Sequence, residues 1–529
     1  MITNQLFSMK SIKKSPAVFF LLLVCCFCQI HAQVTSRQID SIVNYAMSKF
    51  NVAGCAVAVV KDGGILHEKG YGVKSIATNE WVNEHTNFAI ASNSKAFTTA
   101  ALAILVEEGK INWTDKVKDH IPEFTMYNDY VEDNFNIVDL VTHRSGLGLG
   151  MGDLMFFPQG SDFTIDDLLA NFQHFKPESA FRTKWDYDNL LYLVAGELIA
   201  RKSGMTWEAF VESRIFEPLG MDNTYGSLVN IKNTNNLSAS HSTEKGDIRI
   251  IPTFEEMING AAGGIFSNVN DLSQWLLLQL NKGKYGQNLN KQLFSTSNHN
   301  EMWKIHTVMD VNPNPRYNSH FSGYGLGWFL SDEKGNMKVE HTGGLPGMLS
   351  QTILFPDLNL GIVILTNTSN DGGGLFSSVS QTILDMYYGL EDFKWIDKYA
   401  AYMASNKSGD DAATKKVWEA VANMNQDAVD KDKYIGIYED VWFGKIEVFM
   451  KGKQLWIKSH RSPLLNGPLK LYKDETFAIK WEYQDMNADA FAMFTLDENG
   501  KANGLTMKGI SPNIDFSFDF EDLNLKRVD

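Results

Sequence analysis

The chain has 529 residues, of which 44% are hydrophobic and 21% are charged, a composition typical of a globular protein with room for more than one core. Its 48 Lys and Arg against 63 Asp and Glu give a formal net charge of -15. Such a charge repels phosphate backbones and provides no basic stripe for nucleic acid or acidic lipid, so we predict no nucleic-acid partner.

The chain begins with the pattern of a signal peptide. Lys10, Lys13 and Lys14 precede an apolar run over residues 17–27, and a short segment with small residues ends at Ala32. The run is shorter than the roughly 20 residues of a membrane-spanning helix. We therefore predict cleavage after Ala32, no stable membrane anchor, and a periplasmic or secreted protein.

Cysteine usage argues against a disulfide or a metal centre. Three of the four cysteines lie in the predicted signal peptide, and Cys55 alone would remain in the mature chain. A single cysteine within a run of small apolar residues is typical of a buried side chain. We predict no metal and no cofactor.

Helix and strand patterns alternate over the first two thirds of the chain. An amphipathic helix is expected over residues 36–50, and further helices over 190–201 and 206–215. Strand patterns occupy 55–60, 65–72, 324–329, 338–341, 349–355 and 361–366. A sheet built from both ends of this segment, with helices between, predicts an α/β sandwich beside a helical lobe.

The pattern changes beyond Gly389. A polar helical stretch is followed by short strands, expected at 434–439, 445–450, 454–459, 476–482, 490–496 and 514–520. This spacing predicts a small antiparallel barrel or sandwich. We therefore divide the chain into a signal peptide (1–32), a large α/β domain (33–390), a helical linker (391–430) and a β-domain (431–529). The β-domain is expected to have its own core, so that truncation near Gly389 would leave a folded first domain.

Ser92-Asn93-Ser94-Lys95 is the first motif that could carry chemistry. A helix beginning here places Ser92 and Lys95 on one face, where a lysine freed of its proton could activate the serine hydroxyl. The same S-x-x-K spacing recurs at Ser11, Ser242 and Ser331. Only Ser92 is followed by a buried helical pattern, so we favour it as the nucleophile.

Two further motifs follow. Tyr187-Asp188-Asn189 directly precedes an apolar helix; a phenol can relay a proton and an amide can hold a substrate carbonyl, although a helix cap with a packed tyrosine is the structural alternative. His341-Thr342-Gly343-Gly344 ends a strand-like run, where glycines would let a substrate backbone approach the strand edge. A histidine at a strand end is, taken alone, more often structural than catalytic.

In this order the three motifs resemble the S-x-x-K, Y-x-N and K/H-T-G set of class C β-lactamases, serine D,D-peptidases, D-aminopeptidases and related esterases. The likeness extends over residues 39–388 and includes the runs 140–147, 215–221, 263–267 and 324–328. It implies a β-lactamase-like α/β fold, an antiparallel sheet flanked by helices with a helical lobe. The C-terminal barrel-like, all-β domain resembles one often appended to such hydrolases.

The resemblance also implies roles for the residues. Ser92 would form an acyl-enzyme, Lys95 and Tyr187 would share the acid and base work, and Asn189 would bind the substrate's amide. The backbone N–H groups of Ser92 and Gly344 would form the oxyanion hole. His341, Thr342 and Gly343 would complete the substrate-binding edge.

One departure from the family pattern bears on the substrate. Most β-lactamases of this kind have lysine where His341 stands, whereas histidine is similar to certain D,D-peptidases and D-aminopeptidases. A neutral imidazole attracts a carboxylate less than an ammonium does. We therefore expect small peptides, amides or esters, with D-amino acids, as substrates. The alternatives are a β-lactamase and a non-catalytic penicillin-binding or sensor protein; the motifs leave the oligomeric state open.

Overall fold

The computed structural model describes residues 34–529 except 245, 256–257 and 312, and leaves the side chains of 406–411 undescribed. The predicted signal peptide lies outside the described residues. Within the described part of the chain, no helix is both long and apolar enough to cross a membrane.

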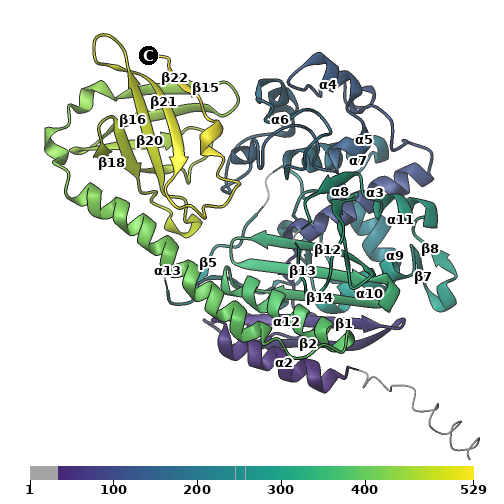
Figure 1. Cartoon of the computed structure of the whole chain (residues 1–529). Helices are drawn as coiled ribbons and strands as arrows, with labels where there is room; N and C mark the ends of the chain where they lie inside the picture. The colour runs from purple at the N-terminus through teal and green to yellow at the C-terminus, as the bar shows by residue number, and fades with distance from the viewer. Residues whose placement is uncertain (1–33, 245, 256–257, 312) are drawn as a thin grey trace, which may run out of the picture.

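An eight-stranded antiparallel sheet organises the first domain (Figure 1). In spatial order its strands are β2 (Gly64–Gly72), β1 (Gly54–Lys61), β14 (Leu360–Thr366), β13 (Met348–Phe355), β12 (Asn336–Leu345), β11 (Phe329–Glu333), β10 (Ser322–Tyr324) and β9 (Thr307–Met309). Both ends of the domain contribute strands, because β1 pairs with β14. This sheet with flanking helices confirms the predicted fold class.

Each face of the sheet is covered by helices. Cys55, Val57 and Val59 pack with the helices α2 (Ser36–Lys49) and α12 (Asp371–Tyr387), whereas the alternate residues of β1 join the core of the helical lobe. This alternation follows from the two-residue period of a strand. The helices of the lobe and of its side of the sheet are α3 (Ser94–Glu107), α4 (Asp129–Asn134), α5 (Ile137–Leu140), α6 (Ile165–Asn171), α7 (Leu190–Ser203), α8 (Trp207–Val211), α9 (Glu217–Leu219), α10 (Val269–Leu280) and α11 (Thr296–Met302).

The strand predicted over residues 324–329 is wrong. β10 ends at Tyr324 and β11 begins at Phe329, with a bend between them in which Gly327 has φ +78°. A Cβ at Gly327 would lie 2.9 Å from the carbonyl oxygen of Lys95, so glycine lets this bend pack closely against α3.

A long helix, α13 (Trp395–Ala422), leads to a closed antiparallel barrel (Figure 1). The barrel strands are β15 (Gly436–Asp440), β16 (Gly444–Lys451), β17 (Gln454–Ser459), β18 (Asn466–Lys473), β19 (Thr476–Ile479), β20 (Ala490–Leu496), β21 (Ala502–Gly509) and β22 (Leu525–Arg527). Sequence patterns missed β18, β21 and β22, because Gly467-Pro468 and Gly504 weaken the strand signal and β22 is very short.

The strand predicted over residues 514–520 is also wrong. Its apolar residues alternate as in a strand, but in the structure the segment is irregular and ends in a short 3₁₀ turn at Phe520–Asp522. Phe518 and Phe520 are buried, and the ring of Phe518 lies 5.0 Å from that of Phe157 in the first domain. Burial does not follow the alternation, because Phe516 is exposed whereas residues 517–520 are all buried.

The barrel and the helical lobe share one continuous hydrophobic core. Trp442 packs edge-on against Phe175, with ring centroids 5.5 Å apart, and Phe443 lies 5.8 Å from Phe163. Arg461 of the barrel also pairs with Asp167 at 2.8 Å, which lowers the pKa of that carboxyl to about 2. The core of the barrel is therefore in contact with that of the lobe, and a folded first domain after truncation near Gly389 stays a prediction.

This shared core leads to a first prediction. Trp442→Ala should lower the free energy of unfolding by about 3–5 kcal/mol, the usual cost of emptying a large aromatic site. The neighbouring Val441, 66% exposed, provides the matched control Val441→Ala, which should change it by less than about 0.5 kcal/mol. Chemical denaturation of the full chain measures both. Equal stability of the two variants would contradict a shared core.

Candidate active site

Ser92 lies on a tight turn immediately before the buried helix α3. The turn spans Ala91–Asn93, and Ala91 has φ +48°, an unusual conformation for a residue with a side chain. Ser350 on β13 holds both ends of the turn, because its hydroxyl donates to the carbonyl of Ile90 at 2.6 Å and accepts from Asn93 Nδ2 at 2.8 Å. The turn is thus fixed to the sheet, with Ser92 at its partly exposed centre.

Lys95 lies beneath Ser92, as the helical spacing predicts. Its side chain is fully buried, and its Nζ lies 3.1 Å from Ser92 Oγ. Nζ also donates to Asn189 Oδ1 and to the carbonyl oxygen of Ala262, each at 2.8 Å. The ammonium or amine is therefore surrounded by oxygen atoms, with the nucleophile as one of them.

Tyr187 completes this group from the segment before α7. Its ring centroid is 4.7 Å from Lys95 Nζ. Burial raises the pKa of the Tyr187 phenol, and a hydrogen bond with Ser92 opposes part of that increase. The phenol is thus kept protonated beside the serine, where it can pass on a proton.

Asn189 is placed differently from the sequence-based expectation. Its Oδ1 accepts from Lys95, and its Nδ2 donates to Asp153 Oδ2 at 2.8 Å. Both ends of the amide are therefore engaged inside the protein. These contacts favour a role in holding Lys95 over a role in binding the substrate's amide.

The H-T-G motif lies within β12, which continues to Leu345 instead of ending at the motif. Residues 341–345 pair only with β13, because the β11 ladder ends at Glu340. Their other edge therefore faces the cavity that contains Ser92, and Thr342 and Gly344 line it. A Cβ at Gly343 would lie 2.1 Å from the carbonyl oxygen of Ile90, so only glycine fits beside the nucleophile turn.

His341 is buried and neutral. Its Nδ1 lies 2.6 Å from the carbonyl oxygen of Thr342, which can only accept, so Nδ1 carries the proton. Its Nε2 lies 2.9 Å from the Tyr324 hydroxyl and accepts from it. Burial, followed by the nearby Lys95, lowers the pKa of His341 to about 3. The imidazole thus presents no positive charge to the cavity.

This lowered pKa predicts an acid-dependent loss of stability. In the unfolded chain histidine has a pKa of about 6.5, so below that pH it takes up a proton that His341 does not take up in the native protein. Its stabilising contribution is present above about pH 6.5 and is lost as the pH falls towards about 3. The loss is on the order of several kcal/mol, at about 1.4 kcal/mol for each pKa unit.

Thermal melting of the wild type and His341→Gln between pH 7 and pH 4 measures this effect. Every other titrating group is common to the two proteins, so the difference between the two melting curves isolates His341. The wild type should lose more stability over that range. Parallel curves would mean that His341 takes up its proton in the native state.

The sequence analysis assigned no role to several residues that surround these groups. His143 stacks on Tyr187, with ring centroids 4.2 Å apart, and its Nδ1 accepts from the Asp188 backbone at 3.0 Å. Asp153 and Ala262 contact Asn189 and Lys95, as described above. His143 lies within the family-like run 140–147, and Ala262 directly precedes the run 263–267. These two runs could therefore have indicated that both residues lie near the site.

The cavity has a volume of about 750 Å³ and lies between the two domains. Ser92, Tyr187 and His341 line one side, and Asn513, Phe516 and other barrel residues line the opposite side. Its acidic side chains are Glu244, Asp485 and Asp515; the described lining residues include no Lys or Arg. Asp485 is paired with Arg249, which lies outside the lining.

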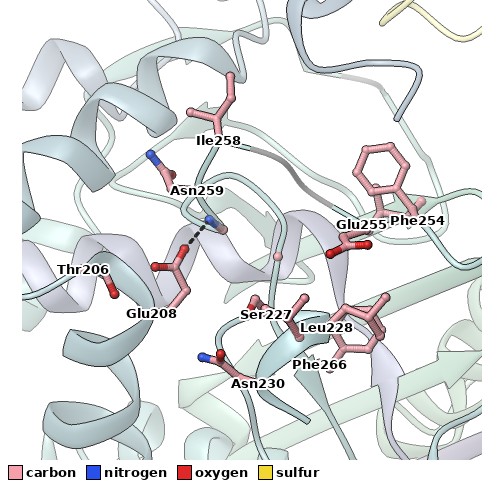
Figure 2. A pocket seen from close by; sticks show the side chains of 14 residues that line it. Thr206, Glu208, Ser227, Leu228, Asn230, Phe254, Glu255, Ile258, Asn259 and Phe266 are labelled. Carbon is pink, nitrogen blue, oxygen red and sulfur yellow. Dashed lines mark hydrogen bonds between the residues drawn. The ribbon is translucent and has the colours of Figure 1, made fainter. Parts of the chain in front are cut away.

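A second, smaller cavity of about 220 Å³ adjoins the first and shares Phe254 and Leu345 with it. Glu208, which is labelled in Figure 2, lines this cavity. Its Oε1 accepts a hydrogen bond from the backbone N–H of Gly260 at 3.0 Å. Gly260 begins the segment that carries Ala262, whose carbonyl binds Lys95. The second cavity thus borders the segment whose Ala262 carbonyl binds Lys95, and Ser92 is not among its described lining residues.

The fold and this group of residues are similar to those of the penicillin-recognising class of serine hydrolases. The Beta-lactamase family model matches residues 39–376, and the model for a domain of unknown function (DUF3471) matches residues 424–527. The chain therefore belongs to the Beta-lactamase family and carries an additional C-terminal domain, which confirms the resemblance stated above.

Curated relatives are distant. The chain is 26% identical over 353 residues to Protein flp of Staphylococcus aureus (strain MW2), covering 64% of each chain. It is 26% identical over 343 residues to Unguisins hydrolase ungD' of Aspergillus campestris, covering 62% of this chain and 61% of that one. The match thus spans somewhat less than two thirds of the length of these relatives.

Solved structures share the fold over nearly the whole chain. The octameric penicillin-binding protein homologue from Pyrococcus abyssi has a TM-score of 0.58 at 18% identity, covering 92% of this chain and 99% of that chain. The crystal structure of SurE has a TM-score of 0.54 at 16% identity, covering 93% and 99%. At these identities the likeness concerns the fold alone.

Proposed function

We propose that the protein hydrolyses a small amide, peptide or ester through an acyl-enzyme on Ser92. Ser92 Oγ attacks the substrate carbonyl while Lys95, with Tyr187, takes the hydroxyl proton. The bond to the leaving group then breaks, and the leaving group receives that proton. Water, deprotonated by the same groups, finally releases the acyl product and restores Ser92.

The observation that carries this proposal is the contact of Lys95 Nζ with Ser92 Oγ at 3.1 Å, inside a buried group that opens into a cavity. The presence of Ser92, Lys95 and Tyr187 together disfavours the non-catalytic alternative, because a protein without turnover need not keep all three. We assign the oxyanion site to the backbone N–H groups of Ser92 and Gly344, where one donor can be worth about 3 kcal/mol.

The charge of the cavity supports our choice of substrate class. A β-lactam, like a D,D-peptidase substrate, carries a carboxylate, which calls for a cationic partner. Neutral His341 supplies none, and the described lining residues include no Lys or Arg. Of the acidic lining residues, Asp485 is already paired with Arg249 and burial raises the pKa of Asp515, so Glu244 supplies the negative charge. A substrate with a free amine, such as a D-amino-acid amide or ester, is electrostatically better matched. This ranks a β-lactamase activity second.

Intact-mass measurement and steady-state kinetics test the proposal. The full chain should gain one adduct with a fluorophosphonate, and kcat/KM should be higher for a D-amino-acid p-nitroanilide than for its N-acetylated form or for benzylpenicillin. Rapid penicillin hydrolysis would instead support the β-lactamase alternative. Neither adduct nor turnover would support the non-catalytic one.

We also propose that the protein is exported, because Lys10, the apolar run 17–27 and Ala32 follow the order of a signal peptide. N-terminal sequencing of protein purified from its native cells should give a chain beginning at Gln33. Recovery of Met1 or Met9 would contradict export with cleavage at this site.

A further inference from the structure

We propose that the C-terminal barrel is part of the catalytic apparatus: its segment 510–520 seats Asp153, and Asp153 holds the Asn189 amide in the orientation that serves Lys95. This inference rests on the hydrolase function proposed above. It makes Asp153, Ser517 and Asp519 positioning residues, since each acts on the reaction through Asn189.

The contacts form one chain of hydrogen bonds from the barrel to the nucleophile. Ser517 Oγ donates to Asp153 Oδ2 at 2.9 Å, and the same carboxylate oxygen accepts from Asn189 Nδ2 at 2.8 Å. Asn189 Oδ1 then accepts from Lys95 Nζ at 2.8 Å, and Nζ lies 3.1 Å from Ser92 Oγ. All three intermediate side chains are buried.

Asp519 holds the backbone on both sides of Asp153. Its Oδ2 accepts from the N–H of Gly152 at 2.6 Å, and its Oδ1 accepts from the N–H of Leu154 at 3.0 Å. Burial, followed by the proximity of Asp153, raises the pKa of Asp519 well above its usual range. Two neighbouring buried carboxyls are costly for a domain interface. Such a cost concentrated beside catalytic groups indicates a functional role.

The orientation of the Asn189 amide decides what Lys95 can do. A neutral lysine amine has two N–H groups and one lone pair. When Ala262 and Asn189 each offer a carbonyl oxygen, the two N–H groups are used and the lone pair remains for the Ser92 proton. An amide turned by 180° would present its NH₂ to Lys95 and compete for that lone pair. Burial raises the pKa of Asp153 well above its usual range, and its Oδ1 has no hydrogen-bond partner among the described residues, so Oδ1 is the place for a proton. Oδ2, which accepts from Ser517 and Asn189, then selects the amide orientation that leaves the lone pair to Ser92.

The wall of the cavity is built from the same segment. Phe516 lines the cavity and packs edge-on against Tyr187, with ring centroids 5.9 Å apart. Ser517, the next residue, begins the hydrogen-bond chain. One segment of the barrel therefore contacts both Tyr187 and Asp153, the residue that holds the Asn189 amide.

A double-mutant cycle between Ser517 and Asn189 in the full chain tests the inference, with the rate of covalent labelling by a fluorophosphonate as the readout. Ser517→Ala should slow labelling about tenfold, a typical value for losing one buried hydrogen bond. In an Asn189→Ala background the same change should alter the rate less than about twofold, because the amide that Ser517 orients is absent. Asp519→Asn should follow the same pattern.

Ser462→Ala is the matched control, because Ser462 is a buried serine of the same barrel that lies outside this chain of hydrogen bonds. Its labelling rate should equal that of the wild type. The inference is overturned if Ser517→Ala and Asp519→Asn label at the wild-type rate, or if they slow labelling equally in both backgrounds. A wild-type protein that is not labelled at all would refute the proposed hydrolase function instead.

Discussion

Ser92→Ala should abolish both covalent labelling and turnover while leaving the fold intact. In the proposed reaction the Ser92 oxygen is the atom that bonds to the acyl group. Loss of a serine nucleophile reduces kcat on the order of 10⁶-fold in hydrolases whose catalytic residues act as a unit. Intact mass after fluorophosphonate treatment and steady-state rates measure the loss, with circular dichroism confirming the fold.

The competing S-x-x-K serine at Ser331 provides the matched control for this experiment. Ser331 lies on β11, and Lys334 follows the strand's end, so no helix brings the two side chains together. Ser331→Ala should retain wild-type labelling and turnover. An adduct that maps to Ser242 or Ser331, or full activity in Ser92→Ala, would show that the site has been assigned wrongly.

Lys95→Met should be almost as damaging as the loss of the nucleophile. Methionine keeps much of the packing volume of the fully buried side chain but removes the amine that takes the Ser92 proton. Only substrate binding and oxyanion stabilisation would remain, which in serine hydrolases leaves roughly 10³–10⁴-fold acceleration over water. Steady-state rates on the D-amino-acid p-nitroanilide measure the effect.

Adding Tyr187→Phe to Lys95→Met gives the stricter form of this prediction. If the two residues handle one proton, Tyr187→Phe should cost much less in the Lys95→Met background than in the wild type. The wild type, the two single variants and the double variant form a double-mutant cycle, and steady-state rates on the D-amino-acid p-nitroanilide measure it. Fully additive losses would mean that Lys95 and Tyr187 act in separate steps, and the proposed sharing of acid and base work would fall.

Local sequence was sufficient to predict the contact between Ser92 and Lys95. Ser92 and Lys95 are three residues apart at the start of an apolar helix, and helical geometry alone places them one turn apart. The apolar run over residues 55–60 likewise predicted a strand, which the structure has as β1. These features depend on backbone periodicity, which can be recognised from residues close together in the sequence.

A period of two does not identify a strand at residues 514–520. The apolar side chains alternate there, yet the segment pairs with no strand in the described chain. Residues 517–520 are all buried, and Phe518 packs against Phe157 of the first domain. Alternation in the sequence therefore does not specify the structure where another domain covers the segment.

The amino-acid sequence by itself determined the family, the α/β and barrel architecture, and the pairing of Ser92 with Lys95. The tertiary structure alone decided the environment of that pair: Ala262 is 167 residues from Lys95, and Ser517 is 364 residues from Asp153. It also decided that His341 is buried and neutral. Contacts across such separations leave no periodic pattern in the chain, because they depend on how finished elements pack and on which polar groups remain to be hydrogen bonded inside the interface.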